Sequence, residues 1–151
     1  MQISKQDRQI IALLYQDCRR SNVELAEQVG MSPSACWRRV KALEEAGIIR
    51  RYGVVIDEEK LGMNFRAMVD VSLSRHDPEN GAKFEQAMSD CDLVVQCYAT
   101  TGREDYSMLV VCADINAYND FLDRFLFKLT CVENVLTNVI LKEVKRHGLI
   151  V

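Results

Sequence analysis

Residues 32–53 of this 151-residue chain read SPSACWRRVKALEEAGIIRRYG and predict a short helix with a cationic outer face. A serine that can cap the helix start is followed by a proline at the first helical position, where a missing N–H is no loss. Cys36, Val40 and Leu43 follow at spacings of four and three, so they share one buried face. The outward positions are then Ser34, Ala35, Trp37, Arg38, Lys41 and, toward the flank, Arg39.

Two further helices are predicted before this one. In SKQDRQIIALLYQDCRR the apolar residues have helical spacing, and Ser4 with Asp7 three residues later is a start signal. In SNVELAEQVG, Ser21 and Glu24 form a capping box, and Gly30 suits the left-handed residue that ends a helix. A capped helix, a tight turn and a second capped helix make a helix-turn-helix.

The cationic helix is therefore expected to enter the major groove of double-stranded DNA. Arg38 has the planar fork that binds guanine O6 and N7 or a phosphate, whereas Arg39 and Lys41 are expected to contact phosphates. Trp37 packs either against the first helix or against the sugar-phosphate backbone. The alternative, a merely solvated charged face, fits less well because the cations fall on the recognition helix. The predicted DNA-contacting residues are Ser32, Ser34, Ala35, Trp37, Arg38, Arg39, Lys41 and Arg51.

Charge is distributed unevenly along the chain, whose net charge is −3. Residues 1–53 contain nine Lys and Arg against six Asp and Glu, whereas residues 54–151 contain ten against sixteen. This asymmetry supports a basic module for a polyanion followed by an acidic module with another task. We predict a DNA-binding domain over 1–53, a linker over 54–64 and a second domain over 65–151, with IIRRYGVVID as a strand leading out of the first domain.

The second domain shows strand and helix periods in the order βαββαβ. Ala67, Val69, Val71 and Leu73 alternate with polar residues, and Asp114 can cap a later amphipathic helix. This order predicts an α+β chain whose second domain is a ferredoxin-like antiparallel sheet with both helices on one face. The expected elements are strand 67–74, helix 78–91, strands 93–101 and 106–114 joined by the turn GRED, helix 115–129 and strand 135–145.

One face of that sheet has no helix, and its apolar residues favour self-association into a homodimer. No apolar run is long enough to span a membrane, so we expect a cytoplasmic protein. The six cysteines show no metal-binding spacing, and His76 and His147 stand alone in polar segments. We therefore expect no enzyme, no metal and no cofactor.

The segment DRQIIALLYQDCRRSNVELAEQVGMSPSACWRRVKALEEAGIIRRYGVVID, followed by a βαββαβ unit with TTGREDY, resembles the Lrp/AsnC family of leucine- and asparagine-responsive, or feast/famine, regulators. The resemblance covers essentially the whole chain. It implies a winged-type DNA-binding domain and an effector-binding RAM domain in a cytoplasmic, nucleoid-associated regulator. It also implies homodimers that assemble into octamer-like rings and bind an amino acid in clefts between dimers.

The resemblance places the amino-acid site near the hairpin turn. Gly102, Asp105 and Tyr106 match the family's G-x-x-D-Y motif, and Thr137 on the last strand is a further candidate. A zwitterion needs an anion for its ammonium and donors for its carboxylate, and a glycine turn exposes such N–H groups. The predicted effector-binding residues are Thr100, Thr101, Gly102, Arg103, Glu104, Asp105, Tyr106 and Thr137.

Departures from the family pattern leave the ligand and an alternative open. Many members have a small or uncharged residue and an aromatic where this chain has Arg103 and Glu104, so leucine is not assumed as the effector. Trp37 replaces a smaller residue, so the DNA sequence is open too. The alternative function is a thiol-responsive regulator, or one that responds to a sulfur amino acid, using Cys36, Cys91 or Cys97.

Overall fold

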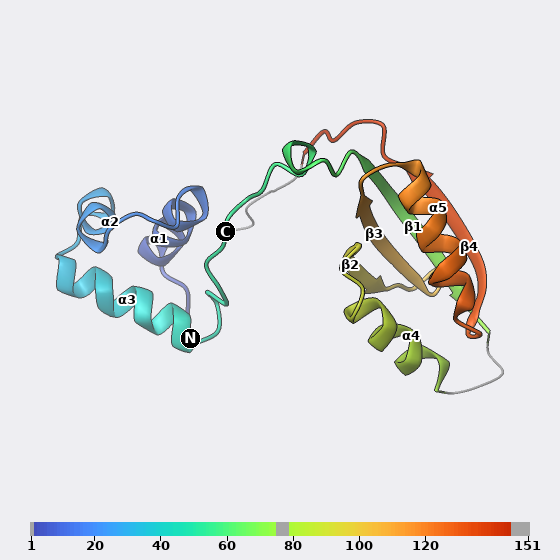
Figure 1. Cartoon of the computed structure of the whole chain (residues 1–151). Coiled ribbons are helices and arrows are strands. Elements are labelled where there is room, and N and C mark those ends of the chain that lie inside the picture. The colour runs from blue at the N-terminus through green and yellow to red at the C-terminus, as the bar shows by residue number, and fades with distance from the viewer. Residues whose placement is uncertain (1, 75–78, 146–151) are drawn as a thin grey trace. The chain divides into compact units, whose positions relative to one another are not determined.

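The computed structural model of the chain describes residues 2–74 and 79–145 (Figure 1). The chain folds into two compact units, the first extending to Val55 and the second formed by Ile56–Val144. Each unit has its own hydrophobic core. Together they form the predicted α+β chain, with helices alone first and a sheet with helices second.

The first unit contains α1 (Lys5–Gln16), α2 (Asn22–Val29) and α3 (Pro33–Glu45). The predicted start signal of α1 and the predicted capping box of α2 are both confirmed, and both are capping boxes: Ser4 and Asp7 satisfy each other's backbone N–H groups at the start of α1, and Ser21 and Glu24 do so at α2. Gly30 ends α2 with a φ of 66°, in the left-handed region where glycine is favoured. The helix-turn-helix is therefore specified locally, by residues a few positions apart.

The core of the first unit is formed by one face of each helix. Cys36 and Leu43 of α3 are fully buried, and Val40 is half-buried beside them, which confirms the predicted stripe. The buried residues of this core are Ile10, Leu25, Ala26, Val29, Cys36 and Leu43.

The segment after α3 departs from the prediction. Residues 50–57 have no regular secondary structure, and Val54 and Val55 are 83% and 74% exposed. A strand needs a neighbour to satisfy its backbone groups, and the four-stranded sheet of the described residues does not include this segment. The predicted strand is therefore wrong for the single chain, although its β-branched pattern is present. A short 3₁₀ helix, η1 (Glu59–Leu61), leads into the second unit.

The second unit has the predicted βαββαβ order, and its sheet confirms the ferredoxin-like prediction. All strand pairs are antiparallel, in the order β2-β3-β1-β4. In the central pairings Val69 lies opposite Met108 on one side and Thr137 on the other. The elements are β1 (Phe65–Leu73), α4 (Asn80–Ser89), β2 (Val94–Ala99), β3 (Tyr106–Cys112), α5 (Ile115–Arg124), η2 (Leu126–Lys128) and β4 (Val132–Val139).

Some element boundaries differ from the predicted ones. β4 begins at Val132 and ends at Val139, because its register with β1 runs from Leu73 back to Ala67. α5 ends at Arg124 and gives way to η2. The predicted start of α4, at position 78, lies outside the described residues. The strand prediction placed β4 too late because its apolar pattern continues beyond the last pairing.

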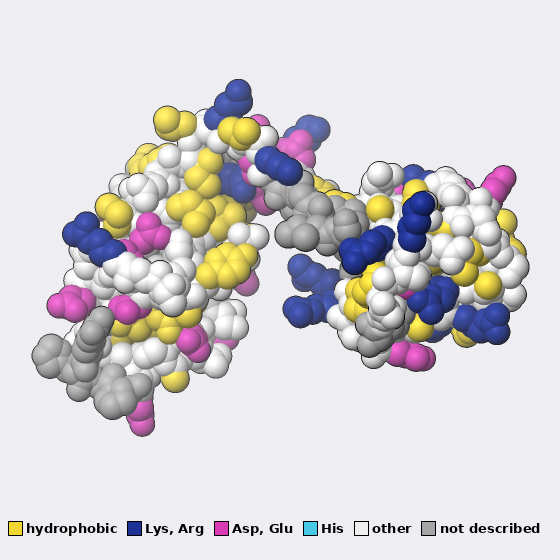
Figure 2. Space-filling view, turned by 180° about the vertical axis from the view of Figure 1, so that it is seen from behind, with side chains coloured by type: hydrophobic (Ala, Val, Ile, Leu, Met, Phe, Trp, Pro, Cys, Tyr) yellow, Lys and Arg dark blue, Asp and Glu magenta, His cyan; other side chains and the backbone are white. Residues whose placement is uncertain are grey.

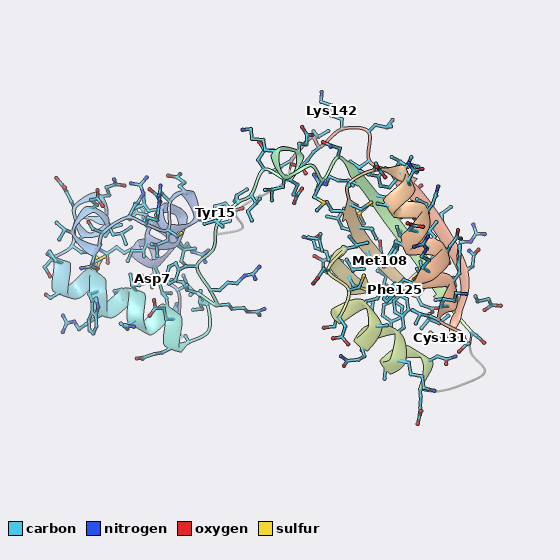
Figure 3. All side chains as sticks on the ribbon, viewed as in Figure 1. Asp7, Tyr15, Met108, Phe125, Cys131 and Lys142 are labelled. Atoms are coloured by element: carbon cyan, nitrogen blue, oxygen red, sulfur yellow. The ribbon has the colours of Figure 1, made fainter. Side chains whose placement is uncertain are left out.

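The second core lies between the helices and one face of the sheet. The alternating residues of β1 are fully or almost fully buried, as predicted, and meet Phe84 and Met88 of α4 and Tyr118 and Phe121 of α5. Met108 is buried, and the partly buried Phe125 packs against the same cluster (Figure 3). Burial of aromatic and aliphatic side chains of this size is the main stabilising contribution.

The opposite sheet face contains the intervening residues. Leu109 and Val111 on β3 are buried, Met68 on β1 is half-buried, and Leu136 on β4 is half exposed. Tyr98 on the edge strand β2 is 56% exposed. Figure 2 shows hydrophobic side chains gathered among polar ones on the surface of this unit.

Candidate DNA-binding face and effector turn

The outward face of α3 consists of the side chains that the helical spacing predicts. Trp37, Arg38 and Lys41 are exposed, on the side opposite the buried Cys36 and Leu43. Ser32 and Ser34 are exposed at the helix start and Ala35 is half-buried. The face thus has small side chains at its beginning and aromatic and cationic side chains in its middle, and it is open to solvent in the single chain.

Ser32 has a structural role as well. Its Oγ accepts a hydrogen bond of 3.3 Å from the Ala35 N–H and so caps α3, as predicted. Its Oγ also lies 3.3 Å from the Ser34 Oγ. The N-terminal turn of α3 is therefore well defined, which fixes the backbone that carries the cations.

Arg38 and Lys41 differ in their surroundings. In the described part of the chain, the Arg38 guanidinium forms no hydrogen bond or ion pair. The Lys41 Nζ lies 3.0 Å from the Glu44 Oε2, and the Glu44 Oε1 accepts a 2.7 Å hydrogen bond from Tyr52. These contacts, the Tyr52 hydroxyl first, hold the pKa of Glu44 below its usual range. Arg38 is thus the more available cation.

Arg39 requires a correction. It was predicted to contact phosphate, but its guanidinium turns toward α1 and holds Asp7, with Nε 2.7 Å from Oδ1 and Nη2 bonded to Oδ2. The Asp7 side chain is fully buried, whereas that of Arg39 is 36% exposed. The sequence signal for Asp7 was only its place three residues after Ser4 in the start signal of the first helix, and its partner Arg39 lies 32 residues away. We therefore remove Arg39 from the DNA-facing set.

Trp37 and Arg51 remain in that set. More than half of Trp37 is exposed, and Trp37 is not one of the side chains that pack against the first core. This favours contact with the sugar-phosphate backbone over packing on α1. Arg51 is exposed in the extended segment after α3.

The β2–β3 hairpin turn contains most of the predicted effector-binding residues. Hydrogen bonds from Thr100 close the turn. The Thr100 N–H donates to the Asp105 carbonyl at 2.9 Å, and the Thr100 Oγ1 donates to the Glu104 carbonyl at 3.0 Å. Thr101, Gly102 and Arg103 are exposed beyond this closure. The turn is thus a defined loop with an open tip.

The two acidic residues of the turn hold it against β1. The Asp105 N–H donates to the Val71 carbonyl at 3.0 Å, and the Asp105 Oδ2 accepts from the Leu73 N–H at 2.8 Å. The Ser72 hydroxyl donates to the Glu104 Oε2. Ser72 and Glu104 lie close together although the sequence offered no signal for that pairing.

Several polar groups of the turn have no partner in the described residues. The backbone N–H groups of residues 101–104 donate no hydrogen bond there, and the Asp105 Oδ1 accepts none. The Arg103 side chain does have a partner, because its Nε lies 3.6 Å from the Glu104 Oε1, but it is 97% exposed. Successive free N–H groups bind anions, and a carboxylate oxygen binds a cation. The turn therefore offers both halves of a zwitterion site.

Tyr106 follows the turn and is buried against Phe84, with ring centroids 4.7 Å apart. Its hydroxyl donates to the Glu85 Oε1 at 2.8 Å. Burial, with the Glu85 carboxylate second, raises the pKa of Tyr106 to about 12. A groove of about 440 Å³ lies beside it, lined by Glu85, Met88, Ser89, Val94, Val95, Gln96, Cys97, Ala99 and Tyr106.

Thr137, the further candidate for the pocket of the turn, lies apart from the turn in the single chain. It lies opposite Val69, on the helix-covered face of β4. Its Oγ1 is 2.6 Å from the Tyr118 hydroxyl of α5. Within the single chain the hydroxyl therefore joins a helix to the sheet, and Thr137 is not part of the turn.

The cysteines are all free thiols. Cys36, Cys112 and Cys131 are buried, and burial raises the pKa of the Cys36, Cys97 and Cys112 thiols. Protonated, buried thiols are poor nucleophiles, so the geometry does not favour thiol sensing at Cys36 or Cys97.

His76 and His147 lie outside the described residues. Over residues 2–74 and 79–145, no group of His, Cys, Asp and Glu side chains is arranged to hold a metal ion. No helix in that part of the chain has the length and apolar character needed to cross a bilayer.

Both units match known families. Residues 3–50 match the family model "Winged helix-turn-helix DNA-binding", and residues 66–150 match "Lrp/AsnC ligand binding domain". The three-helix unit with its cationic α3, followed by the ferredoxin-like unit, defines a DNA-binding regulator with a ligand-binding domain.

Known transcriptional regulators are similar to this chain over nearly its whole length. The chain is 33% identical over 144 residues to the transcriptional regulator AzlB of Bacillus subtilis, covering 95% of this chain and 92% of that protein. A transcriptional regulator of Neisseria meningitidis in complex with L-methionine has a TM-score of 0.92 at 32% identity, covering 96% and 94%. A feast or famine regulatory protein of Mycobacterium tuberculosis with L-methionine has a TM-score of 0.84 at 29% identity, covering 96% of each chain. The chain belongs to the Lrp/AsnC family of transcriptional regulators.

Proposed function

We propose that this regulator binds DNA through the outer face of α3 and that an amino acid bound at the β2–β3 turn changes its DNA binding or its assembly. The observation that carries the proposal is the turn itself. N–H groups at residues 101–104 that donate no hydrogen bond and an Asp105 Oδ1 that accepts none belong to the same hairpin turn, whose residues 101–103 are exposed. This pairing of donors and an anion suits the main-chain groups of an amino acid.

The N–H groups would bind the α-carboxylate, and Asp105 would bind the ammonium. The exposed Arg103 guanidinium, whose Nε lies 3.6 Å from the Glu104 Oε1, adds a cation for the carboxylate, and Glu104 adds negative charge next to Asp105. These contacts involve only the main-chain groups of the amino acid and do not define a pocket for its side chain. L-Methionine is the first candidate ligand, because two of the structural relatives were solved with it.

A dimer through the helix-free sheet face is part of the proposal, as is further assembly into octamer-like rings with the amino acid in clefts between dimers. The exposed apolar residues of that face, Tyr98 and Leu136, support such a contact. A two-fold dimer presents two recognition helices to half-sites about one helical turn apart or a multiple of it. Sedimentation that shows only monomer at micromolar protein concentration would contradict this part. A regulator of this kind would work in the cytosol at the nucleoid.

The DNA half is tested by binding to duplex DNA at increasing salt. Phosphate contacts release counterions, so between about 50 and 200 mM salt the affinity should fall by roughly a thousandfold or more for six to ten contacts. Arg38→Ala should lower affinity for the preferred sequence by about 1 to 3 kcal/mol if the guanidinium contacts a guanine. Binding that is insensitive to salt would refute the phosphate-contact proposal.

The ligand half is tested by a thermal-shift screen of the common amino acids with the full chain. A ligand that binds only the folded protein stabilises it by about 2.7 kcal/mol at a hundred times its Kd. L-Methionine should raise the Tm, and an equal concentration of methionine methyl ester, which lacks the carboxylate, should not. If no amino acid shifts the Tm, the effector proposal fails while the DNA proposal stands.

A further inference from the structure

Asp7 and Arg39 form a two-pronged contact between α1 and α3. The Arg39 Nε lies 2.7 Å from the Asp7 Oδ1, and its Nη2 bonds the Asp7 Oδ2. Asp7 projects from the first turn of α1 into the space between the two helices (Figure 3). A planar guanidinium that meets a carboxylate through two parallel bonds fixes direction as well as distance.

Asp7 is also fixed from the other side. Its Oδ2 accepts hydrogen bonds from the Ser4 N–H at 2.8 Å and from the Ser4 hydroxyl at 2.7 Å. The carboxylate is fully buried and therefore cannot change its rotamer without leaving those partners. The capping box that starts α1 thus holds the anion to which α3 is attached.

The apolar contacts of α3 with the first core involve few of its residues. Only Cys36 and Leu43 among its residues are fully buried, and apolar packing has no directional preference. Arg39 is the next residue after Arg38, and successive residues on a helix project about 100° apart. Holding the Arg39 side chain against α1 therefore sets the direction in which Arg38 leaves the helix.

We propose that the Asp7–Arg39 pair orients α3 for sequence-specific DNA binding, and that Arg39 is a positioning residue that does not contact phosphate. This inference rests on the proposed DNA contact of the α3 face. It separates two adjacent arginines by role. Arg38 meets the DNA, and Arg39 determines how Arg38 meets it.

The neighbouring arginines allow a matched experiment on the full chain. A preferred duplex is first selected from a random DNA pool by the wild-type protein, and a mixed-sequence duplex serves as the non-specific probe. Affinity for both duplexes is measured against salt for wild type, Arg38→Ala, Arg39→Met, Asp7→Ala and the double variant Asp7→Ala with Arg39→Met. Arg39→Met retains much of the apolar stem that packs beside α1.

The expected results distinguish orientation from charge. Asp7→Ala and Arg39→Met should each weaken binding to the selected duplex by about tenfold or more, the size of one bidentate base contact. Neither variant should change the salt slope or the affinity for the mixed-sequence duplex. The double variant should bind the selected duplex as tightly as the more weakly binding of the two single variants does. Arg38→Ala should lower the magnitude of the slope by about 0.9 if it also holds a phosphate.

Three results would overturn the proposal. In the first, Arg39→Met lowers the slope by about 0.9 while Asp7→Ala binds as wild type does, which would make Arg39 a phosphate contact. In the second, neither variant changes the affinity for the selected duplex. In the third, both duplexes lose affinity equally.

Folding is checked by circular dichroism at the assay temperature. If Asp7→Ala or Arg39→Met is unfolded there, the milder Asp7→Asn and Arg39→Lys replace them, with the same expectations. Should these be unfolded as well, the pair is a stability element only and the positioning proposal is wrong. If wild type selects no duplex or Arg38→Ala has no effect, the proposed DNA contact fails instead, which is a separate outcome.

Discussion

The Asp105 Oδ2 accepts a 2.8 Å hydrogen bond from the Leu73 N–H, and this contact ties the β2–β3 turn to the end of β1. The same carboxylate is the proposed anion for the ligand's ammonium. One side chain therefore has a structural oxygen and a free oxygen. Truncating it removes both at once, so a loss of ligand response after truncation has two explanations.

Replacing Asp105 by Asn separates the two roles. The amide retains an oxygen for the Leu73 N–H but loses the negative charge, so Asp105→Asn should remain close to wild type in stability and lose the thermal shift with L-methionine. Asp105→Ala should lose the shift and also about 1 to 3 kcal/mol of unfolding free energy, because a backbone donor is left without its partner. An Asp105→Asn variant with a normal ligand shift would show that the carboxylate does not bind the ammonium.

Gly30 and Gly102 provide a second matched comparison. Gly30 has a φ of 66°, whereas Gly102 has no positive φ, and a Cβ added at either would meet no atom within 4 Å. Gly30→Ala should therefore lower the unfolding free energy by about 1 kcal/mol through backbone strain alone. Gly102→Ala should leave stability unchanged in urea unfolding. A destabilised Gly102→Ala would mean that the turn relies on glycine for its own fold.

Acid should weaken the first unit through Asp7. The Arg39 hydrogen bond, assisted by Ser4, lowers the pKa of Asp7 to about 2 in the folded chain, below its ordinary 3.8. The stability that this provides is fully present above about pH 4 and is lost as the pH falls toward 2, because the unfolded chain binds the proton first. We expect a loss on the order of 1 to 2 kcal/mol.

Urea unfolding of the first unit at pH 6, 4 and 3 measures this acid loss. Asp7→Asn should have a flatter profile than wild type over that interval. Asp17→Asn, at the other end of α1, is the matched control and should follow wild type. If Asp7→Asn is as sensitive to acid as wild type, the lowered pKa is not the cause.

Thr137 and Tyr118 should behave as a structural pair. Tyr118→Phe and Thr137→Val each remove one hydroxyl of a 2.6 Å hydrogen bond and should cost about 0.5 to 1.5 kcal/mol of unfolding free energy. The double variant should cost less than the sum of the two, because both singles remove the same bond. L-Methionine should still raise the Tm of Thr137→Val. Loss of that shift alone would return Thr137 to the ligand site.

Thiol reagents test the alternative in which cysteines sense the signal. Cys36, Cys112 and Cys131 are buried and should react with a colorimetric disulfide reagent only after the protein is unfolded. Cys18, Cys91 and Cys97 are half-buried and should react slowly in the folded protein. Fast reaction of one native thiol that also releases DNA would favour the thiol-responsive function.

The sequence was informative where structure is set by near neighbours. Ser4 with Asp7, Ser21 with Glu24, and Asp114 with the start of α5 are contacts within three residues, and each cap is present. The alternation of β1 identifies its buried face because one side of a sheet must meet the helices. Element order then leaves few possible topologies.

It was less informative where the outcome depends on distant partners. Arg39 looks like any outward cation until Asp7, 32 positions earlier, is brought beside it. Thr137 was a candidate for the ligand pocket, but its contact with Tyr118 could not be predicted because strand register, which decides the face on which Thr137 lies, is not written in β4 itself. Residues 50–57 have a strand-like pattern but no strand to pair with in the single chain.

The two hydrophobic clusters have no member in common. The DNA-binding unit and the ligand-binding unit can consequently change independently in evolution, since a substitution that repacks one cluster leaves the side chains of the other in place. For protein engineering, the same separation makes the region after Val55 a suitable point at which to join the ligand-binding domain of one relative to the DNA-binding domain of another.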